Sequence, residues 1–302
     1  MRESAATLRR PALRGVLYTI LSAILFGITP IFVRCAYEDG VNGITMTFLR
    51  GAISLPVLAV ILLVGKHPFA VTRAQARDMI VGSGFFGTVT TFLMYASYVY
   101  IPVGVSTTLH FIYPVLVSVA CALVYRDKLA PSTIAALIAS VVGVYFTSGG
   151  FSGGENPIGI ALAVASGATF ACNIVYLEKS QIHAVHHFTY AFYVCLMSSA
   201  FAGVCGLATG ELSLALPPRV WLLATTASLM SAIGASTLLK VGVKMSGATS
   251  ASILSTFEPI TSVALGFLVL GETVTTSIIL GGALIIASVI VIAVQGACAT
   301  GR

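Results

Sequence analysis

Charged side chains are scarce in this sequence. Of the 302 residues, only 9% are Asp, Glu, Lys or Arg, whereas 57% are hydrophobic. A soluble domain carries about 25% charged residues, so the composition excludes an ordinary soluble enzyme, a disordered chain and a collagen-like chain. Together with a mean hydropathy of +1.00, this scarcity predicts a polytopic membrane protein that is surrounded mainly by lipid.

Other features that would indicate different chemistry are also missing. The six cysteines form no CxxC pair, so we expect free thiols rather than a metal or redox site. The positive charges are scattered singly, which argues against nucleic-acid binding despite the net charge of +6. His183, His186 and His187 lack a fourth ligand at metal-site spacing. The apolar run after residues 1–14 lacks a small-residue cleavage site, so it predicts a first membrane helix and no signal peptide.

Long apolar runs are what the sequence does contain. A membrane-spanning helix needs about 20 mostly apolar residues. Ten such runs are separated by short polar or proline-containing breaks, and the break at Pro102 divides a run that is too long for one crossing. The predicted spans are 15–35, 43–64, 79–100, 102–125, 131–149, 157–178, 187–209, 219–241, 246–270 and 274–296.

The basic residues predict how the chain lies in the membrane. If the N-terminus is cytoplasmic, 13 of the 16 Lys and Arg residues lie on the cytoplasmic side. Only Arg34, Arg50 and Arg219 lie on the other side. Cytoplasmic loops of membrane proteins carry an excess of Lys and Arg. We therefore predict a multi-pass protein of a bacterial-type plasma (inner) membrane with both termini in the cytoplasm.

The chain also resembles itself at a shift of about 145 residues. The repeat aligns Ser22 with Ser166, Phe26 with Phe170, and Pro114 with Pro259, among other matches. The predicted units are residues 15–149 and 157–296, with five spans each. Because five is odd, the second unit must enter the membrane in the opposite orientation. Inverted repeats are typical of secondary transporters, which bind substrate near the midplane at the repeat interface.

These features resemble the drug/metabolite transporter superfamily, specifically its EamA-type exporters. The likeness rests on Phe48-Leu49-Arg50 in span two and on a mid-span proline followed by a terminal acid in spans four and nine. The first copy runs from His110-Phe-Ile-Tyr-Pro114 to Asp127, and the second runs from Ser255-Thr-Phe-Glu-Pro259 to Glu272. The first copy departs from the family pattern, with Arg126-Asp127 in place of Gly-Glu. The resemblance implies transport of a small metabolite.

One acid stands apart from the loops. Glu258 lies twelve residues from each end of span nine, which is about 18 Å and therefore close to the midplane. A charge at this depth is costly and usually functional. We expect Glu258 to bind a substrate amine or a proton, with a buried structural acid as the alternative. His110 and Tyr113 lie at a similar depth in span four, and His110 could equally be a buried histidine bonded to backbone.

Two prolines are expected to kink these spans. Pro114 and Pro259 each remove one backbone donor, which would free the carbonyls of His110 and Ser255. A carbonyl without a partner at mid-membrane must face protein or water. Both breaks should therefore line a central cavity and serve as structural kinks or as gates.

Further polar residues are candidates for the cavity wall. Asn173 and Tyr176 lie in span six, and Tyr95 and Tyr98 lie in span three, although Tyr98 could also belong to an interfacial aromatic belt. For Arg50 in span two, two interpretations remain. Its side chain could reach outward to Glu38 or Asp39, or it could bind a substrate carboxylate.

The sequence thus predicts an all-α transporter of ten membrane helices, arranged as two inverted five-helix repeats. We expect alternating access and a small-molecule substrate, with amino-acid export as the first candidate. The alternative is export of purines, cationic drugs or quaternary amines. Transport would couple to protons at Glu258 or His110, or it would be facilitated diffusion. No HExxH motif or aspartate pair is present, so we expect no enzyme activity, cofactor or metal. The chain is expected to be a monomer or a weak homo-oligomer in the lipid bilayer.

Overall fold

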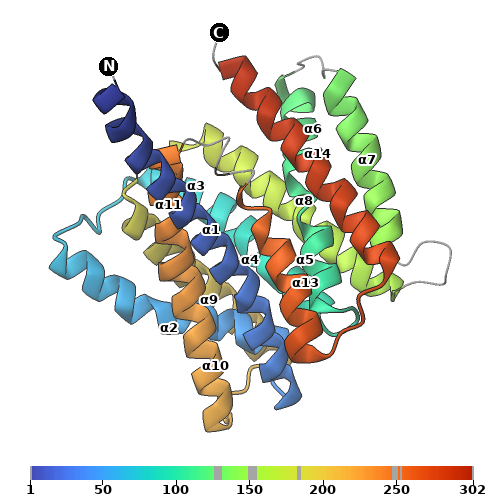
Figure 1. Ribbon diagram of the computed structural model, residues 1–302. Helices are drawn as coiled ribbons and strands as arrows, with labels where there is room; N and C mark the ends of the chain where they lie inside the picture. The colour runs from blue at the N-terminus through green and yellow to red at the C-terminus, as the bar shows by residue number, and fades with distance from the viewer. Residues whose placement is uncertain are drawn as a thin grey trace.

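The computed structural model describes residues 2–125, 131–148, 155–181, 185–246, 251 and 254–300. Regular structure in these ranges is helical throughout (Figure 1). The first half contains α1 (Arg2–Glu38), α2 (Gly43–Val64), α3 (Arg73–Met79), η1 (Ile80–Gly87), α4 (Thr88–Ser97), α5 (Val103–His110), α6 (Tyr113–Tyr125) and α7 (Pro131–Thr147). The second half contains α8 (Pro157–Lys179), α9 (His187–Thr209), α10 (Pro218–Leu229), η4 (Met230–Ala235), α11 (Ser236–Ser246), α13 (Phe257–Leu270) and α14 (Thr276–Thr300).

Ten apolar helical stretches correspond in order to the ten predicted spans. Within the described residues, six are long and apolar enough to cross a membrane, and four are shorter apolar helices. The shorter ones are Val103–Val117, Pro131–Thr147, Phe257–Leu270 and Thr276–Val291. The fold-class prediction is confirmed: the chain is an all-α polytopic membrane protein of ten helices in two inverted repeats.

The third span begins earlier than the sequence analysis predicted. Its helix starts at Arg73 rather than at residue 79. Thr72 accepts a hydrogen bond from the Gln75 backbone, and the Gln75 side chain accepts one from the Thr72 backbone. This capping box satisfies two donors at the helix start. Local capping therefore extends the helix beyond the purely apolar run.

Spans three and eight share an unusual feature. Each contains a π-helical segment, η1 in the first repeat and η4 in the second. π-helical turns are rare and often lie at functional sites. Their occurrence in corresponding spans indicates that the two repeats share local geometry as well as helix order.

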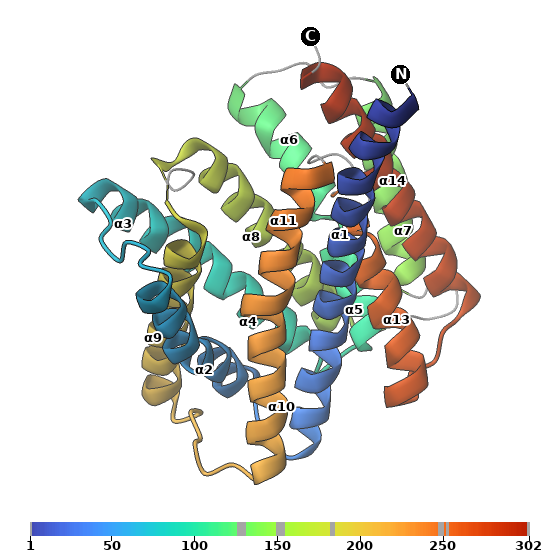
Figure 2. The ribbon, with the colours of Figure 1, turned by 60° about the vertical axis from the view of Figure 1, so that its left-hand side comes forward.

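Helix packing follows the inverted repeat. Helix α1 packs against α11 and α13, whereas its counterpart α8 packs against α4, α5 and α6. The first span thus contacts spans eight and nine, and the sixth contacts spans three and four. The self-related pairs, α2 with α9 and α7 with α14, pack across the interface (Figures 1 and 2). The interface between repeats is therefore the central feature of the bundle.

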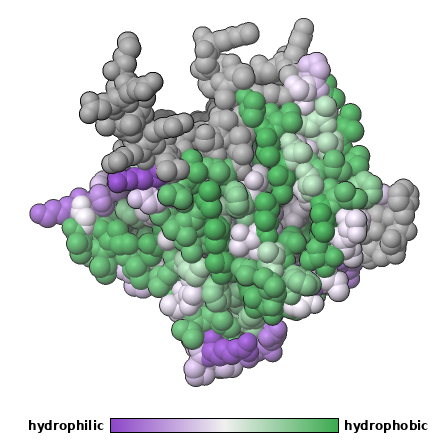
Figure 3. Space-filling model, in the orientation of Figure 1, coloured by the Kyte–Doolittle hydropathy of each residue, from purple (hydrophilic) through white to green (hydrophobic). Residues whose placement is uncertain are grey.

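The surface is suited to lipid. Apolar residues cover most of the face shown in Figure 3, and the strongly hydrophilic residues lie at its left and lower edges. Leu63, Leu207, Leu222 and Leu268 are each at least two-thirds exposed. Such exposure of apolar surface would be unfavourable in water and is expected in a bilayer.

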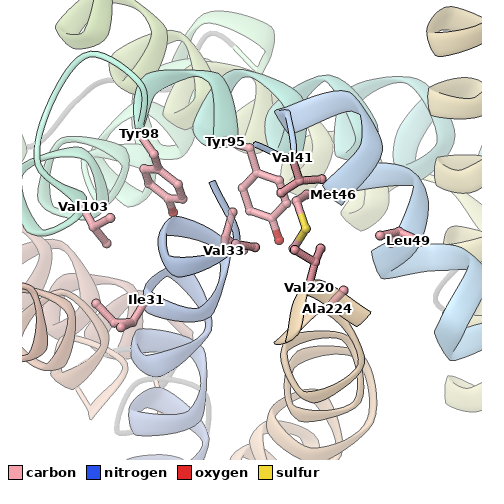
Figure 4. Close-up of a cluster of buried hydrophobic side chains, with 11 residues drawn as sticks. Ile31, Val33, Val41, Met46, Leu49, Tyr95, Tyr98, Val103, Val220 and Ala224 are labelled. Atoms are coloured by element: carbon pink, nitrogen blue, oxygen red, sulfur yellow. The ribbon is translucent and has the colours of Figure 1, made fainter. Parts of the chain in front are cut away.

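The two ends of the bundle differ. Both chain termini lie at one end, which we call the terminal end (Figure 1). The other end, which we call the opposite end, carries the loops after α1, α4 and α9. There the ends of α1, α2, α4 and α10 converge on a buried apolar cluster that includes Val33, Met46, Tyr98, Val103 and Val220 (Figure 4).

Polar contacts also close the opposite end. The Glu272 carboxylate accepts hydrogen bonds from the backbone N–H groups of Val103, at 2.6 Å, and Gly104, at 3.2 Å. These are unpaired donors at the start of α5, where negative charge is favourable. The terminal acid of the second repeat thus caps a helix of the first repeat. Its counterpart, Asp127, lies outside the described residues, as does Arg126.

Candidate functional site

A cavity of about 380 Å³ lies between the two repeats. Its lining comes from spans one to four and six to nine, and no described residue of α7 or α14 contributes. The polar and aromatic residues that matter below are Arg50, Thr91, Tyr95, Tyr98, His110, Tyr113, Phe170, Asn173, Ser255 and Glu258. Six of the seven predicted substrate-binding residues therefore line one cavity.

Breaks in spans four and nine shape the cavity wall. Helix α5 ends at His110 and α6 begins at Tyr113, while α13 begins at Phe257 after a turn at Ser255. The expectation of a free Ser255 carbonyl is wrong, because it accepts a hydrogen bond of 3.0 Å from the Glu258 N–H. A shorter-range bond replaces the one that Pro259 removes. The breaks nevertheless bring both segments to the cavity.

Small residues let neighbouring helices approach these breaks closely. A Cβ added at Gly167 of α8 would lie 2.8 Å from the His110 carbonyl oxygen. A Cβ added at Gly27 of α1 would lie 2.6 Å from the Glu258 carbonyl oxygen. Only glycine fits at such separations. Each break is therefore held against a glycine of the other repeat.

His110 is a buried and hydrogen-bonded residue. Its Nδ1 lies 2.8 Å from the Ser166 hydroxyl. Its ring lies 5.7 Å from that of Tyr113 and 5.4 Å from that of Phe170, measured between centroids. Tyr113 and Phe170 meet edge to face at 4.7 Å. These three rings form a continuous aromatic wall in which the histidine orientation is set by Ser166.

Glu258 is in a different situation. Its side chain is half-buried at the cavity. Among the described residues it has no hydrogen-bond partner and no basic group within 4.0 Å. Arg50 lines the same cavity. The Glu258 carboxylate is therefore available to an incoming group.

Arg50 does not reach outward to Glu38 or Asp39, so that interpretation is wrong. Both acids pair instead with Arg219, at 3.7 Å and 3.2 Å. Arg50 stays half-buried beside the cavity, where one of its Nη atoms donates to Thr91 at 3.0 Å. Because Glu38 and Asp39 pair with Arg219, the Arg50 side chain stays beside the cavity.

Tyr95 and Tyr98 form the end of the cavity nearest the opposite end. Both are buried, with ring centroids 5.9 Å apart (Figure 4). The Tyr37 hydroxyl and the Arg34 guanidinium donate to their backbone carbonyls. The interfacial-belt interpretation is wrong for Tyr98, because that side chain is fully buried.

The two candidates from span six, Asn173 and Tyr176, lie in different surroundings. Asn173 lines the cavity, and its Oδ1 atom is buried without a partner among the described residues. Tyr176 does not line the cavity. Its hydroxyl instead donates to the Asp78 carboxylate at 3.3 Å, and the same carboxylate accepts from Arg77. Tyr176 therefore belongs to a polar cluster towards the terminal end.

Helix α9 supplies a wall of the cavity that was not predicted from the sequence. His187, Tyr190, Ala191, Val194, Cys195 and Ser198 of α9 all line it. Their spacing of three and four residues follows one face of a helix. That periodic stripe of small and polar residues in an otherwise apolar span was the available signal.

The histidines near the terminal end do not form a metal site in the described part of the chain. His67 and His186 stack at 3.9 Å. Desolvation, followed by the charges of His67 and Lys240, lowers the pKa of His186 below its ordinary value. His183 lies outside the described residues.

Comparison with known proteins agrees with this architecture. An uncharacterized transporter of Synechocystis is 25% identical over 92% of the chain and 92% of its own length. An uncharacterized transporter of Archaeoglobus fulgidus is 26% identical over 90% of the chain and 93% of its own length. Human solute carrier family 35 member G1 is 22% identical over 66% of the chain and 57% of its own length. A solved crystal structure shares the fold, with a TM-score of 0.65 at 16% identity and coverage of 93% and 98%. A family model matches residues 13–149 and again 157–294, and the chain therefore belongs to the EamA-like transporter family.

Proposed function

We propose that this transporter exports amino acids across a bacterial plasma membrane by alternating access. The proposal rests on one observation: a central cavity between the repeats holds the Glu258 carboxylate opposite an aromatic wall. A carboxylate suits a substrate ammonium group, and aromatic rings suit an apolar side chain. The units that move against each other would be residues 15–149 and 157–296.

The location of the cavity supports export from the terminal end. His187 at the start of α9 and Leu239 near the end of α11 both line the cavity and lie towards that end. The opposite end is packed by the apolar cluster around Tyr98. With the terminal end in the cytoplasm, as the basic loops indicate, this is an inward-facing arrangement.

In the proposed complex, the substrate amine binds Glu258 and its side chain lies against Tyr113 and His110. Asn173 supplies a further polar contact, and Tyr95 and Tyr98 close the cavity on the outer side. Pro114 and Pro259 mark the breaks at which spans four and nine would bend during exchange between states. Tyr176 has no part in this proposal because it lies outside the cavity.

The experiment that tests the proposal is a competition panel on the purified chain in proteoliposomes. Radiolabelled phenylalanine would be loaded, and unlabelled amino acids, amines and nucleobases would compete for counterflow. We expect neutral and aromatic amino acids to compete best. Absence of phenylalanine counterflow, together with competition-sensitive flux of another class, would contradict amino-acid export.

The second candidate is export of a cationic drug or a quaternary amine. The observation that favours it is that Glu258 shares the cavity with the aromatic residues Tyr113 and Phe170. An acid beside aromatic rings is a common site for organic cations. In the panel above, this candidate predicts stronger competition by amines than by the amino acids of the same side chain.

We also propose that Glu258 carries a proton when no substrate is bound. A carboxylate that alternates between a proton and an ammonium group would couple export to proton entry. The Glu258→Gln variant should then transport at a rate that no longer changes with pH, whereas the parent protein should change. Equal pH profiles for both proteins would exclude this role.

A further inference from the structure

Two ionisable side chains of opposite type, one basic and one acidic, line the cavity without forming an ion pair. Arg50 comes from the middle of α2 and Glu258 from the start of α13. Both are half-buried, and no Arg50 nitrogen lies within 4.0 Å of a described carboxylate. A charge within a membrane span is costly unless it has a partner or a function. The cavity separates a basic side chain from an acidic one that is free to bind another group.

Thr91 holds the guanidinium in place. Its hydroxyl donates to the Gly87 carbonyl at 3.1 Å, so a lone pair of the same oxygen accepts from Arg50 at 3.0 Å. A guanidinium has five N–H donors in a planar fork; Thr91 uses one of them, and a side-chain hydrogen bond with Tyr95 uses another. The remaining donors suit the two oxygens of a carboxylate.

The backbone around Arg50 is also fixed. Its carbonyl accepts from Ser54 at 3.0 Å, and the preceding Phe48 carbonyl accepts from Ser199 of α9 at 3.3 Å. Gly51 leaves no room for a larger residue where α2 meets Cys195 and Ser199. The guanidinium is therefore presented from a helix that is locked to its neighbour. Such preorganisation reduces the entropy that binding must overcome.

We infer that Arg50 binds the carboxylate of the substrate while Glu258 binds its cationic group. The inference rests on the proposed transport site and narrows its substrate class to zwitterions. A purely cationic ligand would face the uncompensated charge of Arg50 across a cavity of low dielectric constant. The pair of opposite charges thus selects amino acids over the corresponding amines.

The experiment uses three ligands that share a phenyl ring: L-phenylalanine, 3-phenylpropionate and phenethylamine. Their Kd values would be measured by calorimetry on the full chain in detergent. Arg50→Gln should weaken the binding of phenylalanine and phenylpropionate at least tenfold and change phenethylamine less than threefold. Glu258→Gln should weaken the binding of phenethylamine at least tenfold and change the binding of phenylpropionate less than threefold.

Matched variants distinguish binding from folding. Arg73→Gln removes the same charge from an exposed position outside the cavity and should leave all three affinities within twofold of the parent. Arg50→Lys keeps the charge but loses the planar fork, so phenylpropionate should bind it three- to tenfold more weakly. Thr91→Val, which keeps Arg50 itself, should also weaken phenylalanine binding about threefold.

The outcomes separate this inference from the proposed function. Equal phenylpropionate affinity in the parent and in Arg50→Gln would overturn the inference, and so would failure of both carboxylates to bind the parent. If phenylalanine is not transported but phenylpropionate binding still depends on Arg50, amino-acid export is wrong and the carboxylate site stands.

Discussion

Spans four and nine occupy corresponding places in the two repeats, yet they differ in chemistry. Both are broken just before a proline, and both breaks press against a glycine of the other repeat. In span four, His110 is buried and bonded to Ser166. In span nine, the Glu258 carboxylate has no such partner among the described residues and lines the cavity.

The difference shows which properties follow the repeat and which do not. Backbone geometry is shared because the same helix break is needed on both sides of an inverted interface. Side-chain chemistry is not shared, because a single small substrate presents different groups to the two halves. We therefore expect span four to contribute mainly packing and shape, and span nine to contribute mainly charge.

The largest expected effect comes from removing that charge. Glu258→Gln should lower kcat/KM for phenylalanine about 100-fold, because loss of one member of a buried charge pair costs about 2–5 kcal/mol. Tyr113→Phe, which alters the aromatic residue beside the corresponding proline, should lower it less than threefold. Both values would come from initial rates of counterflow in proteoliposomes.

Similar losses of kcat/KM in Glu258→Gln and Tyr113→Phe would contradict this comparison, because spans four and nine would then contribute equally to transport. Thermal unfolding of detergent-solubilised Glu258→Gln provides the control for folding. We expect its thermal unfolding midpoint to stay within a few degrees of the parent while affinity falls.

The next effect concerns the glycines at the breaks. Gly27→Ala should destabilise the protein by about 1–3 kcal/mol, as overpacking of a filled site does. The added methyl group would meet both the Glu258 carbonyl and the Thr261 Cβ, at 2.6 Å and 2.7 Å. Gly167→Ala should cost less, because its closest contacts are longer, at 2.8 Å to the His110 carbonyl oxygen and 3.3 Å to the Ile112 Cγ2 atom. Thermal unfolding of purified variants would measure both.

Gly234→Ala is the matched control for this pair. Its added methyl group would lie 3.5 Å from Leu25 and no closer than 3.8 Å to any other group near it. We expect a change within about 0.5 kcal/mol, the range of ordinary substitutions. A loss at Gly234 as large as that at Gly27 would show that helix packing in general, and not the break, sets the cost.

The smallest expected effect concerns the hydrogen bond between His110 of span four and Ser166. A double-mutant cycle of His110→Ala and Ser166→Ala should give a coupling of about 0.6 kcal/mol, the average for side-chain hydrogen bonds in a membrane protein, and not more than about 1.7 kcal/mol. Unfolding in denaturant would supply the four free energies. Zero coupling would mean that the bond does not hold the ring and that His110 is as available as Glu258.

Most of the architecture could be read from the residues alone. The apolar runs marked ten spans because the bilayer requires about 20 such residues for each crossing. The shift that aligns Pro114 with Pro259 marked the repeat. Helix ends were less well predicted, as at Arg73, because capping by Thr72 and Gln75 is a polar interaction that hydropathy does not register.

The candidate site was only partly predictable. Depth in the membrane identified Glu258, His110 and Tyr113, since depth follows from counting residues. It could not show that Tyr176 turns to Asp78, at 3.3 Å, instead of to the cavity. Nor could it show that α9 supplies a wall, because an apolar span reveals its inward face only when its neighbours are known.

The sequence by itself determined the membrane environment, the ten helices, the inversion of the repeats and the depth of each charge. These follow from local hydropathy and from an odd number of crossings. Only the tertiary structure decided which charges are already satisfied. Arg219 forms ion pairs with Glu38 and Asp39, and Ser166 is hydrogen-bonded to His110. Arg50 and Glu258 line the cavity without forming an ion pair with each other. Pairing depends on distances of a few ångströms between segments far apart in the chain, and only packing sets those distances.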